Sequence, residues 1–158
     1  GSALTVIMEG SRPIILEVQA LVSESHTANS KRQATGFDTN RLNMLLALLE
    51  RKLEIPLSGY DVFINITGGI KITETSADLA VLAAIISSFR NRAISKQTVF
   101  IGEVSLVGDV REVFGMDARL KEASMQNISK ALICKKPLEK TNIKTFIVDE
   151  VTKLLEWY

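Results

Sequence analysis

The sequence has 158 residues, of which 46% are hydrophobic and 23% are charged, a balance typical of one globular domain and not of a disordered chain. Lysine and arginine number 19 and aspartate and glutamate 18, giving a formal net charge of +1, so any basic binding surface must be local. The single cysteine and single histidine exclude an internal disulfide, a multi-cysteine zinc site and a histidine-rich metal site.

The chain shows no targeting or membrane-spanning segment. Its longest uncharged apolar stretch, 79–89, is too short to cross a bilayer, and no signal peptide is present, so a reducing, cytoplasmic setting is expected. The opening Gly1-Ser2 is interpreted as a cloning remnant, which leaves 3–158 as one domain of a longer protein. No G-x-x-x-x-G-K-S/T motif is present, so the chain itself is not expected to hydrolyse ATP.

The first half of the chain is predicted to form strands around one amphipathic helix. Two segments rich in β-branched residues, joined by a short connection, predict an antiparallel pair. A polar stretch without regular patterning predicts a long exposed loop, and leucines at helical spacing predict the helix. The elements expected here are strands 4–8, 14–22 and 60–67, the loop 23–36 and a helix capped by Asp38 or Thr39.

The second half is predicted to contain a buried helix followed by short strands. Residues 79–89 are apolar on nearly all sides, which indicates a central helix. A hairpin is expected at 104–113, with its turn at Gly108-Asp109. The other expected elements are strands 98–101, 131–134 and 146–148 and helices 117–125 and 150–157. With no internal repeat or linker, the fold class is α/β with a mixed sheet in a single domain.

Ser76 is the first candidate for chemistry. It lies just before the predicted buried helix, near the positive end of the helix dipole, where an alkoxide or oxyanion is favoured. The segment Thr75-Ser76-Ala77-Asp78 also matches a capping box. In the alternative interpretation, Thr75 and Asp78 cap the helix and Ser76 has no chemical role.

The segments 72–80 and 102–121 together resemble the proteolytic domain of Lon proteases. In that family a Pro-Ser-Ala-Gly segment supplies the nucleophile, and a Gly-Glu-x-x-Leu-x-Gly-x-Val hairpin leads to a helix that carries a basic lysine. The hairpin is matched by GEVSLVGDVR at 102–111. Ser76 falls at the nucleophile position, but Thr75 and Asp78 replace the flanking proline and glycine, and Asp117 falls at the lysine position.

This resemblance implies a Lon-like fold without peptidase activity. A Ser-Lys dyad needs a neutral amine to take the hydroxyl proton, whereas Asp117 is a far weaker base, and its negative charge disfavours an alkoxide. Lys121 lies one helical turn beyond Asp117, so an active peptidase with a displaced Ser76/Lys121 dyad is kept as an alternative. Otherwise Lys121 is expected to be a surface lysine paired with Asp117.

A closer resemblance is to the C-terminal Lon-like domain of the RadA (Sms) family of bacterial DNA-repair proteins. It extends from about residue 4 to about residue 134, and Ser76 departs from the alanine that is usual at its position in that family. The phrases that carry it are EGSRP at 9–13, EVQALV at 17–22, GFDTNRL at 36–42, DVFIN at 61–65, GGIKITE at 68–74 and DLA at 78–80.

The RadA resemblance implies a role for a longer parent protein. That parent combines a zinc-ribbon segment and a RecA-like ATPase in a hexameric, ATP-driven DNA motor that acts on recombination intermediates. ATP, Mg and Zn belong to the parent, and this chain needs no cofactor or metal. The implied partners are single-stranded or branched DNA bound without sequence preference, other copies in a hexameric ring, and the recombinase RecA. The Lon-like domain is expected to serve as an oligomerisation scaffold and a DNA-binding surface. It is not expected to be an enzyme itself.

Three basic residues are the candidates for DNA contact. Lys31 and Arg32 lie in the predicted loop and Arg41 near the start of the helix that follows, and paired basic residues in a loop suit phosphate contacts. Alternatively the loop is simply solvated, Arg41 pairs with Asp38, and the domain is a ring scaffold that touches no DNA. The next candidate is the lysine-rich segment 130–144, where the scarcity of aromatic residues argues against base stacking.

Overall fold

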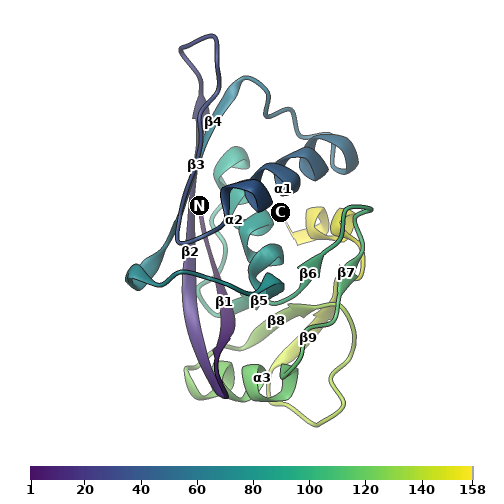
Figure 1. Ribbon diagram of the computed structural model, residues 1–158. Coiled ribbons are helices and arrows are strands. Elements are labelled where there is room, and N and C mark those ends of the chain that lie inside the picture. Colours follow the sequence, from purple (N-terminus) through teal and green to yellow (C-terminus); the bar gives the residue numbers. More distant parts are fainter. Residues whose placement is uncertain (158) are drawn as a thin grey trace.

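A seven-stranded mixed sheet forms the centre of the computed structural model, which describes residues 1–157 (Figure 1). Its strand order is β3-β4-β2-β1-β5-β8-β9, and a separate two-stranded sheet pairs β6 with β7. The strands are β1 (Ser2–Glu9), β2 (Arg12–Glu24), β3 (Arg32–Thr35), β4 (Tyr60–Ile66), β5 (Thr98–Phe100), β6 (Glu103–Val104), β7 (Val110–Arg111), β8 (Lys130–Ile133) and β9 (Lys144–Ile147). The helices are α1 (Thr39–Lys52), α2 (Asp78–Arg90) and α3 (Met116–Met125), with 3-10 turns η1 (Thr67–Gly69), η2 (Thr75–Ala77) and η3 (Val151–Trp157).

The long β1–β2 pair is antiparallel, as predicted, and places Ile7 opposite Ile14. β4 is antiparallel to β2, whereas the β3–β4, β1–β5, β5–β8 and β8–β9 pairs are parallel. The predicted α/β fold with a mixed sheet in a single domain is therefore confirmed.

At the start of the chain, Ser2 opens β1 and the amino group of Gly1 donates a hydrogen bond to the carbonyl of Ala20 (2.9 Å). The interpretation of Gly1 and Ser2 as a cloning remnant stays a prediction.

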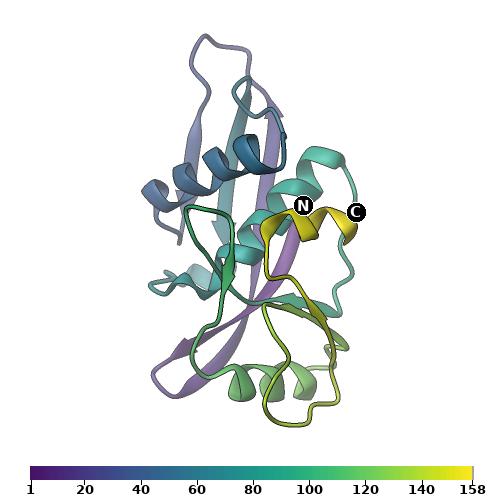
Figure 2. The same cartoon turned by 90° about the vertical axis from the view of Figure 1, so that its right-hand side faces the viewer.

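Each face of the sheet has its own hydrophobic core. Side chains alternate along β1, so Ala3 and Ile7 join the core around α1 and α2, whereas Val6 joins a second core with Leu120 of α3. The two views show α1 and α2 in the upper half of the molecule and α3 at its lower end (Figures 1 and 2). Helix α2 is buried from Asp78 to Ser87, as its all-round apolar sequence predicted. No helix within residues 1–157 has the length and apolarity needed to cross a bilayer.

Three sequence-based expectations differ from the structure. The loop expected at 23–36 contains the end of β2 and all of β3, because β3 gains its hydrogen bonds from β4, which is distant in sequence. The turn of the β6–β7 hairpin is centred on Leu106 and Val107, just before the predicted glycine. The helix expected at 150–157 is the 3-10 element η3 and not an α-helix.

Candidate functional site

Ser76 is buried in η2, immediately before α2, with 1% of its surface exposed. Its carbonyl accepts a hydrogen bond from the Gly102 N–H (2.9 Å), and the Gly102 carbonyl accepts one from the Leu79 N–H (3.2 Å). A Cβ at residue 102 would lie 2.6 Å from the Val110 Cγ1 atom, so glycine lets residue 102 lie close to β7 while making these hydrogen bonds. The segment before β6 therefore packs directly against the serine turn.

The Ser76 hydroxyl donates a hydrogen bond to the Glu74 carboxylate, with 2.5 Å between Oγ and Oε1. The same Oε1 atom accepts from the Met8 N–H (3.0 Å) and from Arg119 Nη1 (2.7 Å), while Oε2 accepts from Arg119 Nη2 (3.3 Å). Glu74 thus serves as the acceptor that joins β1, the serine turn and α3. In this arrangement Ser76 is a hydrogen-bond donor to a carboxylate.

Arg119 is the residue of α3 that reaches this network, and its side chain is 0% exposed. Besides Glu74, its guanidinium donates to the carbonyl of Val6 (2.8 Å, from Nη1) and to the carbonyl of Phe114 (3.0 Å, from Nε). The left-handed backbone of Gly115 (φ 74°) precedes α3 and sets the direction in which the helix starts. Arginine stays protonated in proteins, so Arg119 cannot take a proton from a serine.

The Glu74 carboxylate is held in its ionised form. Burial by itself raises the pKa of Glu74, but the hydrogen bonds from Arg119, Ser76 and the Met8 N–H outweigh burial, and the pKa is lowered overall. A carboxylate with a lowered pKa is a weak proton acceptor at neutral pH. The serine is therefore tied to a group that is poorly suited to act as a general base.

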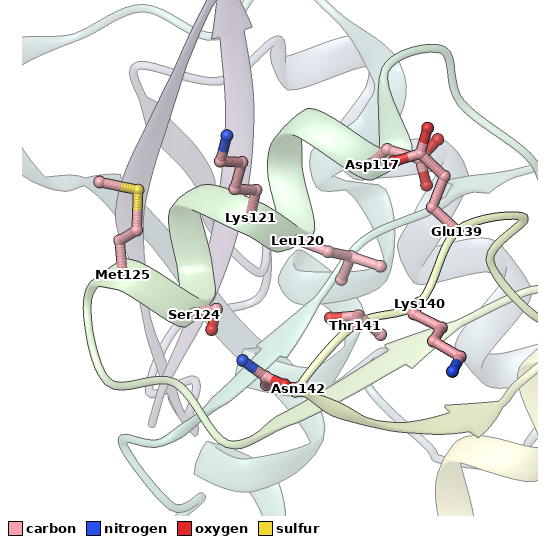
Figure 3. Close-up of a pocket in the computed structure, with 9 residues that line it drawn as sticks. All are labelled: Asp117, Leu120, Lys121, Ser124, Met125, Glu139, Lys140, Thr141 and Asn142. Atoms are coloured by element: carbon pink, nitrogen blue, oxygen red, sulfur yellow. The ribbon is translucent and has the colours of Figure 1, made fainter.

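Asp117 and Lys121 lie on another side of α3, where both line a pocket with the segment 139–142 (Figure 3). Their side chains point in different directions, Asp117 toward Glu139 and Lys121 away from it. Within the described part of the chain, neither side chain makes a hydrogen bond or ion pair with Ser76. The expected ion pair between Asp117 and Lys121 is likewise not formed there, so that prediction is wrong.

The predicted capping role of Thr75 and Asp78 is also wrong, since no side chain caps η2 or α2. Asp78 is 0% exposed and turns its carboxylate toward α1 and β6. There Oδ1 accepts from Arg41 Nε (2.6 Å), and Oδ2 accepts from Arg41 Nη2 and from the Val104 N–H (3.0 Å). The hydrogen bond to Asp78 raises the pKa of Arg41. Asp38, the expected partner of Arg41, instead caps α1 through the Asn40 N–H (3.1 Å).

The three candidates for DNA contact have different surroundings. Lys31 is exposed just before β3, and its amine has no hydrogen bond or ion pair among residues 1–157. Arg32 is half-buried and donates from Nη2 to the carbonyl of Leu57 (2.8 Å). Arg41 is held by Asp78. Lys31 and Arg32 are thus sequence neighbours at the start of β3, with the Arg32 guanidinium turned toward Leu57, and Arg41 lies in a separate, largely buried ion pair.

Two features bear on cofactors. No three His, Cys, Asp or Glu side chains gather within residues 1–157 to hold a metal ion. The sequence also lacks the phosphate-binding motif of P-loop ATPases. The assignment of Zn, Mg and ATP to a longer parent protein therefore stays a prediction.

Comparison with known proteins gives two kinds of match. Residues 25–137 match the family model described as subunit ChlI of Mg-chelatase. Several curated relatives are named DNA repair protein RadA. The one from Campylobacter jejuni is 62% identical over 157 residues, which is 99% of this chain and 35% of the relative. The relative from Helicobacter pylori is 57% identical over 99% of this chain and 35% of the relative. The relative from Escherichia coli is 44% identical over 84% of this chain and 29% of the relative. The chain spans about a third of the length of these relatives.

Proposed function

This chain belongs to the family described as subunit ChlI of Mg-chelatase, and it is similar to proteins named DNA repair protein RadA. From this premise we propose that the chain is a DNA-contacting module without peptidase activity. The similarity to RadA-named relatives covers almost the whole chain, which supports a role in DNA repair. The module would act within a longer protein, since these relatives are about three times its length.

One observation carries the proposal that the module does not cleave peptides. The α3 residue that reaches the partner of Ser76 is Arg119, a permanent cation, and the partner itself is a carboxylate with a lowered pKa. A serine nucleophile needs an adjacent base that can take its proton. A permanent cation cannot do so, and a carboxylate of lowered pKa does so poorly. Lys121, the base in the alternative dyad, is exposed on α3 and has no contact with Ser76 among the described residues.

The Lon-like fold remains part of the proposal. A serine at the start of a buried helix, packed under a short hairpin and beside a further helix, is the arrangement that the Lon resemblance leads one to expect. In the longer protein we assign ATP, Mg and Zn to parts outside this chain. We also assign to the parent a cytoplasmic setting, a hexameric ring with this module as scaffold, and contact with RecA.

DNA contact is proposed at the start of β3. The amine of Lys31 is unpaired within the described residues, and the neighbouring Arg32 adds positive charge close to the surface. The segment 23–36 contains no aromatic residue, so contacts there would be to phosphates and not to bases. The net charge of +1 cannot itself draw the chain to DNA, which makes a local contact testable.

Replacing Lys31 with alanine is expected to lower the slope of log affinity against log salt on duplex DNA by about 0.9, because one phosphate contact is lost. The measurement is fluorescence anisotropy of a labelled duplex at several salt concentrations, with the protein at high concentration. Lys121→Ala, which removes an exposed lysine from α3, is the matched control and should leave the slope unchanged. Equal slopes for wild type and Lys31→Ala would show that the start of β3 does not hold DNA.

A further inference from the structure

Two lysines stand side by side at the far edge of the sheet. Lys130 begins β8 and Lys144 begins β9, and the two residues are register partners in parallel strands. Their side chains therefore leave the same face of the sheet, on strands about 4.8 Å apart. Both are exposed, and neither forms an ion pair within residues 1–157. This pair of cations has no role in the function proposed above.

An aromatic pair adjoins these lysines. Phe146 follows Lys144 on the same face of β9, and the Lys144 Nζ atom lies 5.2 Å from the centre of its ring. Trp157, in η3, packs edge-on against Phe146 with 4.3 Å between ring centres. The indole remains 37% exposed. The chain thus folds back to place an accessible aromatic ring beside cations, which the scarcity of aromatic residues in segment 130–144 did not predict.

The same end of the sheet carries further positive charge. Strands β5, β8 and β9 are parallel, so all three begin at the same end of the sheet. Thr98 of β5 is the register partner of Lys130. Lys96 and Arg92 are exposed in the segment that leads into β5, so they lie near this end of the sheet. Glu156 brings one negative charge next to Trp157, whereas Asp149, beyond the other end of β9, is paired with Lys153 (2.6 Å). Glu17 and Glu122 line pockets with Lys96, so the positive charge at this end rests chiefly on Lys130 and Lys144.

We propose that Lys130, Lys144 and Trp157 form a contact surface for single-stranded nucleic acid, which we call the β9 surface. The lysines would bind backbone phosphates, and the indole would stack on a base, the combination used by proteins that bind single strands without sequence preference. Duplex DNA would satisfy the lysines but keeps its bases paired, and an acidic peptide offers no base to the indole. The inference rests on the proposed role in DNA contact, but the β9 surface is separate from Lys31, since β9 and β3 are opposite edges of the sheet.

The chain supplies its own probe, because Trp157 is its single tryptophan. Titration with an oligothymidylate of about twenty nucleotides, long enough to cover several bases, should quench the tryptophan fluorescence. In anisotropy measurements on the labelled oligonucleotide, Trp157→Leu should weaken binding about 5- to 100-fold, and Trp157→Phe should retain most of it. Lys144→Ala and Lys130→Ala should each lower the salt slope by about 0.7. Lys121→Ala, on the opposite face of the sheet, is the matched control.

Two comparisons can overturn the inference. Inorganic polyphosphate and poly-glutamate carry the charge without bases, so equal quenching by either one, or unchanged affinity in Trp157→Leu, would contradict base stacking at the β9 surface. If the oligonucleotide binds and only Lys31→Ala weakens it, the β9 surface is excluded and the proposed function stands. If neither duplex nor single-stranded DNA binds at low salt, both proposals fail.

Discussion

Replacing Arg119 with methionine is expected to lower the free energy of unfolding by about 3–5 kcal/mol, the usual cost of removing one partner from a buried ion pair. The change leaves the Glu74 carboxylate without its cation, so that Ser76 faces an uncompensated charge. It also leaves the carbonyls of Val6 and Phe114 without their donor. Arg119 is fully buried, so water cannot readily replace the lost contacts.

Urea unfolding followed by circular dichroism measures this loss. The double variant Arg119→Met/Glu74→Leu should recover part of the stability, because it removes the uncompensated charge together with its partner. Lys135→Met, which breaks the exposed Lys135–Glu112 pair (2.8 Å), is the matched control and should leave the stability nearly unchanged, because water screens exposed ion pairs. An Arg119→Met variant as stable as that control would refute the structural role of the pair.

Replacing Arg41 with leucine is expected to cost a similar amount, about 3–5 kcal/mol, because the fully buried Asp78 carboxylate would lose its cation. The guanidinium joins α1 to the start of α2 and also donates to the carbonyl of Val104 (3.3 Å). Adding Asp78→Asn should restore part of the stability, since a neutral amide still accepts from the Val104 N–H without leaving a buried charge. The measurement is again urea unfolding of both variants.

The same variants decide whether Arg41 holds DNA. The double variant Arg41→Leu/Asp78→Asn should retain the wild-type salt slope on duplex DNA, provided that circular dichroism shows it folded. If the slope of log affinity against log salt falls by about 0.9, Arg41 does contact a DNA phosphate. An Arg41→Leu variant with wild-type stability would contradict the role of Arg41 as a buried structural partner.

Local patterning predicted much of the fold. The apolar run in α2 and the β-branched segments of β1 and β2 encode their structures in their own residues, since their periodicity fits only one arrangement. β3 was missed, and η3 was predicted as a helix but not as a 3-10 helix, because local patterning does not show their partners elsewhere in the chain. β3 pairs with β4, and Trp157 of η3 packs against Phe146 of β9.

The site was predicted only in part. Sequence reasoning identified Ser76 and the helix that faces it, but it assigned the base position to Asp117 and overlooked Arg119. A signal was present, because Arg119 lies next to Leu120 and one turn before Ala123, so it shares the apolar face of α3. A charged residue on a buried face requires a buried partner of opposite charge. Glu74 lies only two residues before Ser76 in the sequence, but that spacing alone cannot show that its carboxylate turns toward the hydroxyl.

The most direct test of the central claim is the reactivity of Ser76 itself. The protein is incubated with a fluorophosphonate, which labels serines activated as nucleophiles, and its intact mass is compared with that of Ser76→Ala treated in the same way. We predict no adduct on either protein, because the Ser76 hydroxyl is buried and donates to an ionised carboxylate held by a permanent cation. An adduct that forms on the wild type and disappears in Ser76→Ala would contradict this account and favour a peptidase that uses Ser76.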